Sequence, residues 1–147
     1  MVKLTYFGTI YSKKNSKRIV RTKNRQFLIS SARAIEMEQD MVEQFHTQLR
    51  TQLSTKAGSF DWREETHRIL DGLVPVGVNL KIYNKDKRPR DLDNQATSIL
   101  DGLVKANVLV DDKSDIVRVL RVEYKGIDKE NPRAEIEILP LDESAES

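Results

Sequence analysis

The sequence lacks several features that would point to common kinds of protein. It contains no cysteine, which excludes disulfide bonds and thiolate zinc sites. Its two histidines, His46 and His67, are isolated, which favours surface positions over metal-ligand roles. There is no Gly-rich phosphate loop and no nucleophile elbow. No stretch approaches the roughly 18 apolar residues of a membrane-spanning helix, and the first residues are too polar for a signal peptide, so we expect a cytoplasmic protein.

Basic residues outnumber acidic ones once the end of the chain is set aside. Residues 1–141 contain 25 basic and 20 acidic side chains, a net charge of +5, whereas residues 142–147 contain three acids and no base. Bases are densest between residues 13 and 25, where they are Lys13, Lys14, Lys17, Arg18, Arg21, Lys23 and Arg25. Such density indicates a surface that binds phosphates, with a solubilising hairpin as the alternative.

Hydrophobic periodicity predicts one α+β domain over residues 1–141, followed by a disordered acidic tail at 142–147. Strands are predicted at 2–10, 78–83, 116–125 and 134–141, with a hairpin formed by 18–22 and 25–30. A long helix capped by Ser30 or Ser31 carries an apolar stripe from Ala34 to Leu53. Shorter helices are predicted at 62–72 and 94–106, and Asn107 is a suitable left-handed terminator for the second.

The stretch KRPRDLD, residues 87–93, places three cations next to Asp91 and Asp93. Side chains two residues apart share a face on an extended strand but not on a helix. We therefore expect an extended chain through both acids, with Asp93 capping the helix over 94–106. The positive end of that helix favours negative charge nearby.

Two further acids follow that helix. If residues 107–112 (NVLVDD) return extended and antiparallel to it, Asp111 and Asp112 reach its N-terminal end. Carboxylates gathered in one place repel one another unless a cation neutralises them, and hard divalent cations such as Mg²⁺ prefer oxygen ligands. The pattern therefore predicts a metal site, with an acidic surface loop as the alternative. An EF-hand fits poorly, since Ala96 and Gly102 stand where its loop needs Gly and Glu, and an Asp-x-Asp glycosyltransferase site has no other support.

Residues 90–112 (RDLDNQATSILDGLVKANVLVDD) resemble the RusA family of Holliday junction resolvases. The resemblance rests on the Arg-Asp-Leu-Asp-Asn run, the Leu-Asp-Gly-Leu turn, the Lys-Ala pair and the two final acids, and the early SKKNSKR stretch is also similar. It implies a small α+β fold, a mixed or antiparallel sheet with two main helices packed on it. It further implies a homodimeric endonuclease that cuts four-way DNA junctions in recombination and repair, using Mg²⁺ or Mn²⁺.

The resemblance also implies roles for single residues. Asp91, Asp93 and Asp112 would be the catalytic metal ligands, with Asp111 as an additional ligand. Thr97 is a departure, because family members usually carry a catalytically important lysine at this position. The residues expected to contact DNA phosphates are Lys13, Lys14, Lys17, Arg88, Arg90 and Lys105.

Three functions remain open at this point. We expect a Mg²⁺-dependent endonuclease acting on branched DNA. The alternative is a structure-selective DNA-binding protein of the same fold with little cleavage, which the departure at Thr97 motivates. A third reading, a metal-dependent enzyme acting on a small nucleotide, predicts no affinity for long DNA. Asp101 lies about 12 Å beyond Asp93 along the helix axis, and we expect it to be structural.

Overall fold

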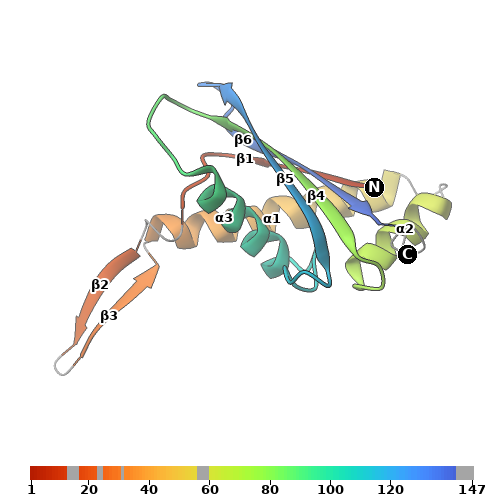
Figure 1. The fold of residues 1–147 in the computed structure, drawn as a ribbon, viewed down its shortest axis with the longest axis horizontal. Helices are drawn as coiled ribbons and strands as arrows, with labels where there is room; N and C mark the ends of the chain where they lie inside the picture. Colours follow the sequence, from red (N-terminus) through yellow and green to blue (C-terminus); the bar gives the residue numbers. More distant parts are fainter. Residues whose placement is uncertain (13–16, 23–24, 31, 56–59, 142–147) are drawn as a thin grey trace.

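The computed structural model describes residues 1–12, 17–22, 25–30, 32–55 and 60–141, and this part of the chain forms the predicted α+β fold (Figure 1). In chain order the elements are β1 (Val2–Phe7), β2 (Lys17–Thr22), β3 (Arg25–Ser30), α1 (Ala32–Thr55), α2 (Phe60–Leu70), β4 (Val76–Asn84), α3 (Leu92–Lys105), β5 (Val117–Ile127) and β6 (Arg133–Pro140). The predicted tail at 142–147 lies outside the described residues. Within them, no helix combines the length and the apolar character that crossing a membrane requires.

Four of the strands form one mixed sheet in the order β1-β6-β4-β5. β6 runs antiparallel to both of its neighbours, whereas β4 and β5 are parallel. Parallel neighbours need a crossover connection, and α3 supplies it between β4 and β5 (Figure 1). β2 and β3 pair with each other in a separate hairpin, which projects away from the sheet.

The core lies between one face of the sheet and the helices. Side chains alternate between buried and more exposed along β1 and β6, as strands covered on a single face require. On the helical side, the predicted stripe of α1 is buried from Ala34 through Leu49, and Leu53 at its end is half-buried. α1 and α3 approach closely at Gly102, where an added Cβ would lie 2.6 Å from Met41 Sδ. This contact explains a glycine inside a helix, where it costs about 1 kcal/mol relative to alanine.

The first strand is shorter than predicted. It ends at Phe7 instead of continuing to Ile10, because Gly8 takes up a φ of 150°, which favours glycine. Beyond this turn the chain leaves the sheet, and the side chain of Ile10 is buried in the core. The turn therefore brings residues 10–12 to α3 instead of extending the sheet.

Candidate functional site

Buried hydrogen bonds join three segments at the N-terminal end of α3. The side chain of Gln95, which is 1% exposed, donates through Nε2 to Asn84 Oδ1 at 3.0 Å and to the Ile10 carbonyl at 3.2 Å. One turn further on, Ser98 Oγ donates to the Tyr11 carbonyl at 2.8 Å. The end of β4, the segment after β1 and the first turns of α3 are thereby held together.

The two acids at this end of α3 lie in different backbone conformations. Asp91 is the N-cap and is extended, with φ −72° and ψ 119°, and its carboxylate accepts a hydrogen bond from Asn94 Nδ2 at 3.1 Å. Asp93 lies within the first helical turn, because α3 begins at Leu92. The prediction of an extended segment through both acids, with Asp93 as the cap, is therefore wrong. Leu92 packs against the core on the same helix face as Ala96, four residues later. This contact favours a helix that begins at Leu92, two residues before the predicted start.

The loop before α3 is organised around Asp86. Its Oδ1 accepts hydrogen bonds from the Arg90 guanidinium at 2.9 Å and from the Arg88 backbone N–H at 3.0 Å. These bonds, that of Arg90 first, hold the pKa of Asp86 below its ordinary value. The Arg90 side chain is only 11% exposed, whereas Arg88 is exposed. Of the two predicted phosphate-binding arginines in this loop, Arg88 is thus the more accessible.

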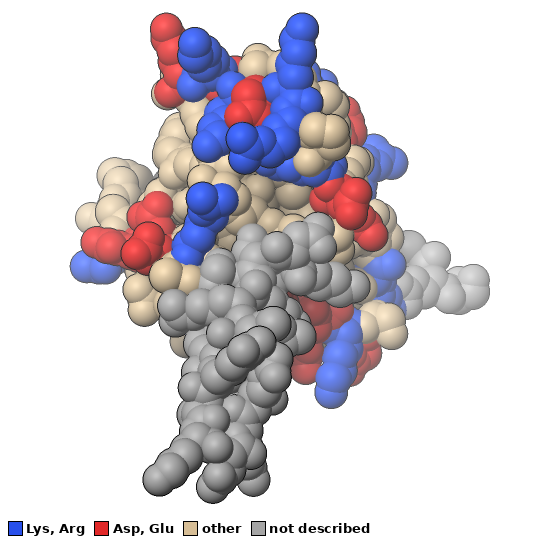
Figure 2. Space-filling view, turned by 90° about the vertical axis from the view of Figure 1, so that its left-hand side faces the viewer, with Lys and Arg blue, Asp and Glu red and all other residues tan. Residues whose placement is uncertain are grey.

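A basic cleft lies beside Asp91, and sequence reasoning identified Arg88 and Arg90 in it but not Tyr11 and Arg33. It encloses about 230 Å³ and is lined by Tyr11, Arg33, Arg88, Pro89, Arg90 and Asp91, among others. The Arg33 guanidinium lies 4.7 Å from the centre of the Tyr11 ring, and Lys85 Nζ lies 5.9 Å from it. Both are cation–π contacts that connect the basic loop to α1. Figure 2 views the molecule from this end and shows Lys and Arg side chains gathered at the top of the face.

The chain after α3 does not return as an extended strand. Asn107 ends the helix in the predicted left-handed conformation, with φ 59°. Val108 and Leu109 are then buried, and their backbone N–H groups donate to the Leu103 carbonyl at 2.9 and 3.3 Å. Because these apolar residues fold back against the end of α3, the expected return of the acids to its N-terminal end does not occur.

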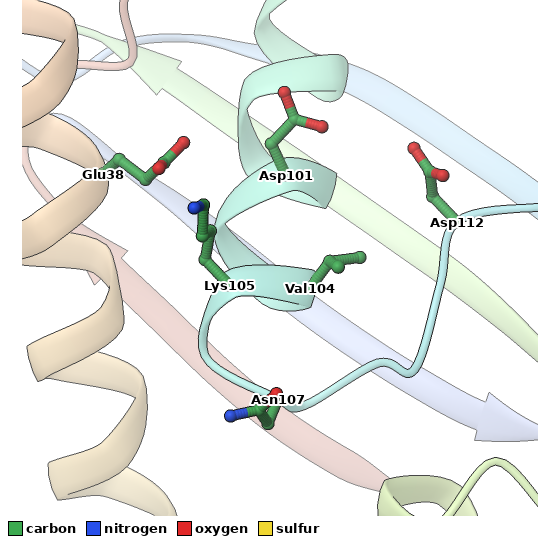
Figure 3. A pocket seen from close by; sticks show the side chains of 6 residues that line it. All are labelled: Glu38, Asp101, Val104, Lys105, Asn107 and Asp112. Carbon is green, nitrogen blue, oxygen red and sulfur yellow. The ribbon is translucent and has the colours of Figure 1, made fainter.

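Asp112 instead lies beside the middle of α3. A hollow of about 560 Å³ is lined by Glu38 of α1, by Asp101 and Lys105 of α3, and by Asp112. Figure 3 shows the Asp101 and Asp112 carboxylates pointing toward one another, with Glu38 facing the same helix. Asp101 was predicted to be structural, but its place in this hollow makes it a candidate functional residue. No pattern in the sequence predicted that Glu38 would lie near Asp101 and Asp112.

Asp111 interacts mainly with its chain neighbours. Its Oδ1 accepts the backbone N–H of Asp112 at 2.7 Å, and Lys113 Nζ lies 3.6 Å from its Oδ2. The hydrogen bond from Asp112 is the main reason that the pKa of Asp111 lies below its ordinary value. Asp111 therefore fixes the backbone conformation that presents Asp112.

A family model described as endodeoxyribonuclease RusA matches residues 9–139. The chain belongs to the RusA endodeoxyribonuclease family. The match includes Tyr11, the basic loop, both groups of acids and strands β4 and β5. The family assignment made from residues 90–112 is thereby confirmed. No curated protein matches the sequence.

The carboxylates that were predicted to bind a metal lie in two separate groups in this structure. Asp91 and Asp93 lie at the start of α3, and Asp112 lies next to Asp101. Among the described residues, no group of three or more His, Cys, Asp or Glu side chains is arranged to hold a metal ion. The carboxylates are donors of the right kind for Mg²⁺, but they do not form a closed cage within one chain.

The other predicted residues fall in several places. Lys13 and Lys14 lie outside the described residues, and Lys17 begins β2. Lys105 is exposed and lines the hollow that contains Asp112. Thr97, where the resemblance leads us to expect lysine, is exposed one turn beyond Asp93, and its Oγ1 donates to the Asp93 carbonyl at 3.0 Å.

We expect Gln95→Leu to lower the free energy of unfolding by about 2 kcal/mol, because the Ile10 carbonyl and Asn84 Oδ1 would stay buried without their donor. Urea denaturation at equilibrium measures the change. Gln39→Leu, the same substitution at an exposed position of α1, is the matched control. Equal stability of the two variants would contradict the role given to the Gln95 hydrogen bonds.

Proposed function

We propose that this protein is a divalent-metal-dependent endonuclease that resolves four-way DNA junctions by phosphodiester hydrolysis, in recombination and repair. The observation that carries the proposal is the RusA family match over residues 9–139. The basic cleft beside Asp91 supports it, because a surface of clustered cations next to carboxylates suits a phosphodiester substrate. The resemblance also implies a homodimer, and two sites related by a two-fold axis fit the symmetry of a four-way junction.

In this proposal the cleft positions the DNA. Arg33 and Lys85 lie over the Tyr11 ring, and Arg88 lines the same cleft as Tyr11. All three would contact backbone phosphates. Such contacts fix the register and orientation of the nucleic acid but do not read its sequence. Lys13, Lys14, Lys17, Arg90 and Lys105 remain predicted phosphate contacts.

In this proposal the metal would be bound partly by the acids and partly by the phosphates of the substrate. Mg²⁺ is usually bound by one or two carboxylates, several waters and substrate phosphates, so a closed cage of protein ligands is not required. Asp91, Asp93 and Asp112 stay the predicted catalytic ligands, with Asp111 as an additional one, and Asp101 joins them because it faces Asp112. When bound, a divalent cation supplies an activated water and charge stabilisation for hydrolysis.

The test is incubation of the protein with a labelled four-way junction and, separately, with a linear duplex of the same arms. We expect paired nicks in the junction with Mg²⁺ or Mn²⁺, and none with a chelator or in the duplex. Junction binding without nicking would favour the alternative, a structure-selective DNA-binding protein. Absence of affinity for either DNA would contradict both and favour an enzyme acting on small nucleotides.

Asp91→Asn and Asp112→Asn should each slow junction cleavage by more than about 100-fold, beyond the usual effect of losing an outer-shell group. Junction affinity should stay equal or rise, because a negative charge near phosphate is removed. Asp101→Asn should also slow cleavage if it acts with Asp112. Asp115→Asn, an exposed acid in the same loop, is the control and should cut normally. Full activity of Asp112→Asn would show that the ligand assignment is wrong.

Replacing both Arg33 and Arg88 with alanine should weaken DNA binding irrespective of sequence. If each contacts one duplex phosphate, the log–log dependence of affinity on salt becomes shallower by about 0.9 per contact, roughly 1.8 in all. Fluorescence anisotropy across a salt series measures the slope. The exposed residues Arg50 and Arg63, replaced together, are the charge-matched control. Identical slopes for the two double variants would place the DNA elsewhere.

Thr97→Lys tests the departure from the family pattern. A lysine one turn beyond Asp93 can carry its ammonium group to a phosphoryl oxygen or to the leaving group, where it stabilises developing charge. If no other cation has taken this role, the variant should cut a bound junction faster than the natural protein in single turnover. A folded variant that binds normally and cuts no faster would show that the absence of lysine at position 97 does not limit the cleavage rate.

A further inference from the structure

A second pocket adjoins the basic cleft and has a different character. It encloses about 260 Å³, and Asn84, Leu92, Gln95 and Tyr124 line it together with the loop before α3. We call it the Tyr124 pocket. Residues 88–90 of that loop line both the pocket and the basic cleft, so the two hollows share one wall.

The floor of the Tyr124 pocket carries a hydrogen-bond donor that has no partner. The Asn84 side chain is 7% exposed, and its Oδ1 accepts the hydrogen bond from Gln95 Nε2 at 3.0 Å. This bond fixes the orientation of the amide, and Asn84 Nδ2 makes no hydrogen bond with the described part of the chain. Buried polar groups are normally paired. A donor held in this way is therefore available to a ligand.

The walls of the pocket are suited to a flat, uncharged group. Asp86 accepts a hydrogen bond from the Arg90 guanidinium at 2.9 Å, so these two charges offset each other. Tyr124 is opposite Ile82 in the register of β5 and β4, on the face of the sheet that carries the core, yet it is 51% exposed. Its ring, with the side chain of Leu92, gives the pocket apolar surface. Pockets that combine apolar walls with a few fixed polar groups bind small ligands in one orientation.

We propose that the Tyr124 pocket takes one nucleobase turned out of the duplex at the branch point of a DNA junction. The base would stack on the Tyr124 ring and accept a hydrogen bond from Asn84 Nδ2 at its edge. Every base has a flat π face for stacking, and a base taken out of the helix is read through hydrogen bonds to its edge. This inference rests on the proposed function.

The wall shared with the basic cleft favours a base over other flat groups. Backbone phosphates bound in the cleft would lie on one side of residues 88–90, and the pocket opens beside the same residues. One strand could therefore place a phosphate in the cleft and its base in the pocket.

A branched substrate makes such a base easier to extract. Turning a base out of a regular duplex costs its pairing and stacking, and this cost is lowest where they are already weakened. Stacking is interrupted where the arms of a junction meet. The pocket would thus favour branched over linear DNA, which contacts to phosphates alone do not achieve.

The first experiment measures the affinity for junctions in which one nucleotide beside the branch point is abasic, taken position by position, with a chelator to prevent cleavage. Loss of one base should weaken binding of the natural chain about fivefold or more, although every phosphate is still present. Tyr124→Ala should weaken binding of the intact junction equally and be insensitive to the abasic site, because both changes remove the same contact. Tyr124→Phe keeps the ring and should behave like the natural chain. Phe7→Ala, an exposed aromatic on the opposite edge strand, is the control and should keep the full abasic effect.

The second experiment tests the floor of the pocket with Asn84→Asp. Aspartate keeps an oxygen that accepts from Gln95 Nε2 but replaces the free donor with an acceptor. When the base at the sensitive position is varied, the order of affinities for the four bases should therefore differ from that of the natural chain. Asn79→Asp, the same substitution on the other face of β4, should leave the order unchanged. Circular dichroism confirms that each variant folds.

Equal affinity at every abasic position would overturn the proposal, as would an abasic effect that persists in Tyr124→Ala or an unchanged order of bases in folded Asn84→Asp. Junction cleavage would continue in each of these cases, so the proposed nuclease function would stand without the base site. A natural chain that binds no junction would contradict the nuclease function and the base site together.

Discussion

The buried hydrogen bonds of Gln95 are the constraint on which the arrangement of the functional groups depends. Asn84 ends β4, Ile10 follows β1, and Gln95 sits in the first turns of α3, so one amide connects three segments that are distant in sequence. Ser98 adds a bond to the Tyr11 carbonyl. The Gln95 amide N–H donors would be costly to bury without these two acceptors, so few other arrangements of these segments are as favourable. The network therefore fixes where the Tyr11 ring, the basic loop and the Asp91 cap lie relative to one another.

The same helix carries two different chemical surfaces. Its first turn meets the cations around Tyr11, and its later turns present Asp101 toward Asp112. A junction lying along α3 would meet cations at one end and carboxylates further on. The distance between the two groups of acids is set by the length of the helix and by the burial of Val108 and Leu109 after it. In the proposed mechanism, the substrate would complete the environment of the metal.

The sequence was sufficient to predict the elements whose patterns are local. The stripe on α1, the alternation along β6 and the left-handed turn at Asn107 all follow from residue type and spacing. The family could also be predicted, because its motif lies within one short run of the chain.

What the sequence did not reveal depends on contacts between distant segments. The start of α3 was misplaced because the core contact of Leu92 was not foreseen. The extended return to Asp112 was wrong because burial of two apolar residues folded the chain back. Glu38 and Arg33 come from α1, so no spacing within the motif region could have placed them at either surface. Gln95 gave only a weak signal, a polar residue on the buried face of a helix, and its partners could not be read from the pattern.

The most direct measurement is the single-turnover rate at which the folded Gln95→Leu variant cleaves a saturating four-way junction, compared with the natural chain and with Gln39→Leu. If the buried network positions the DNA-binding cleft against the acids, the rate should fall at least about tenfold at a temperature where all three proteins are fully folded, since small displacements at a reacting centre are costly. Equal rates in all three proteins would contradict the account, because they would show that the site keeps its geometry without the hydrogen bonds of Gln95.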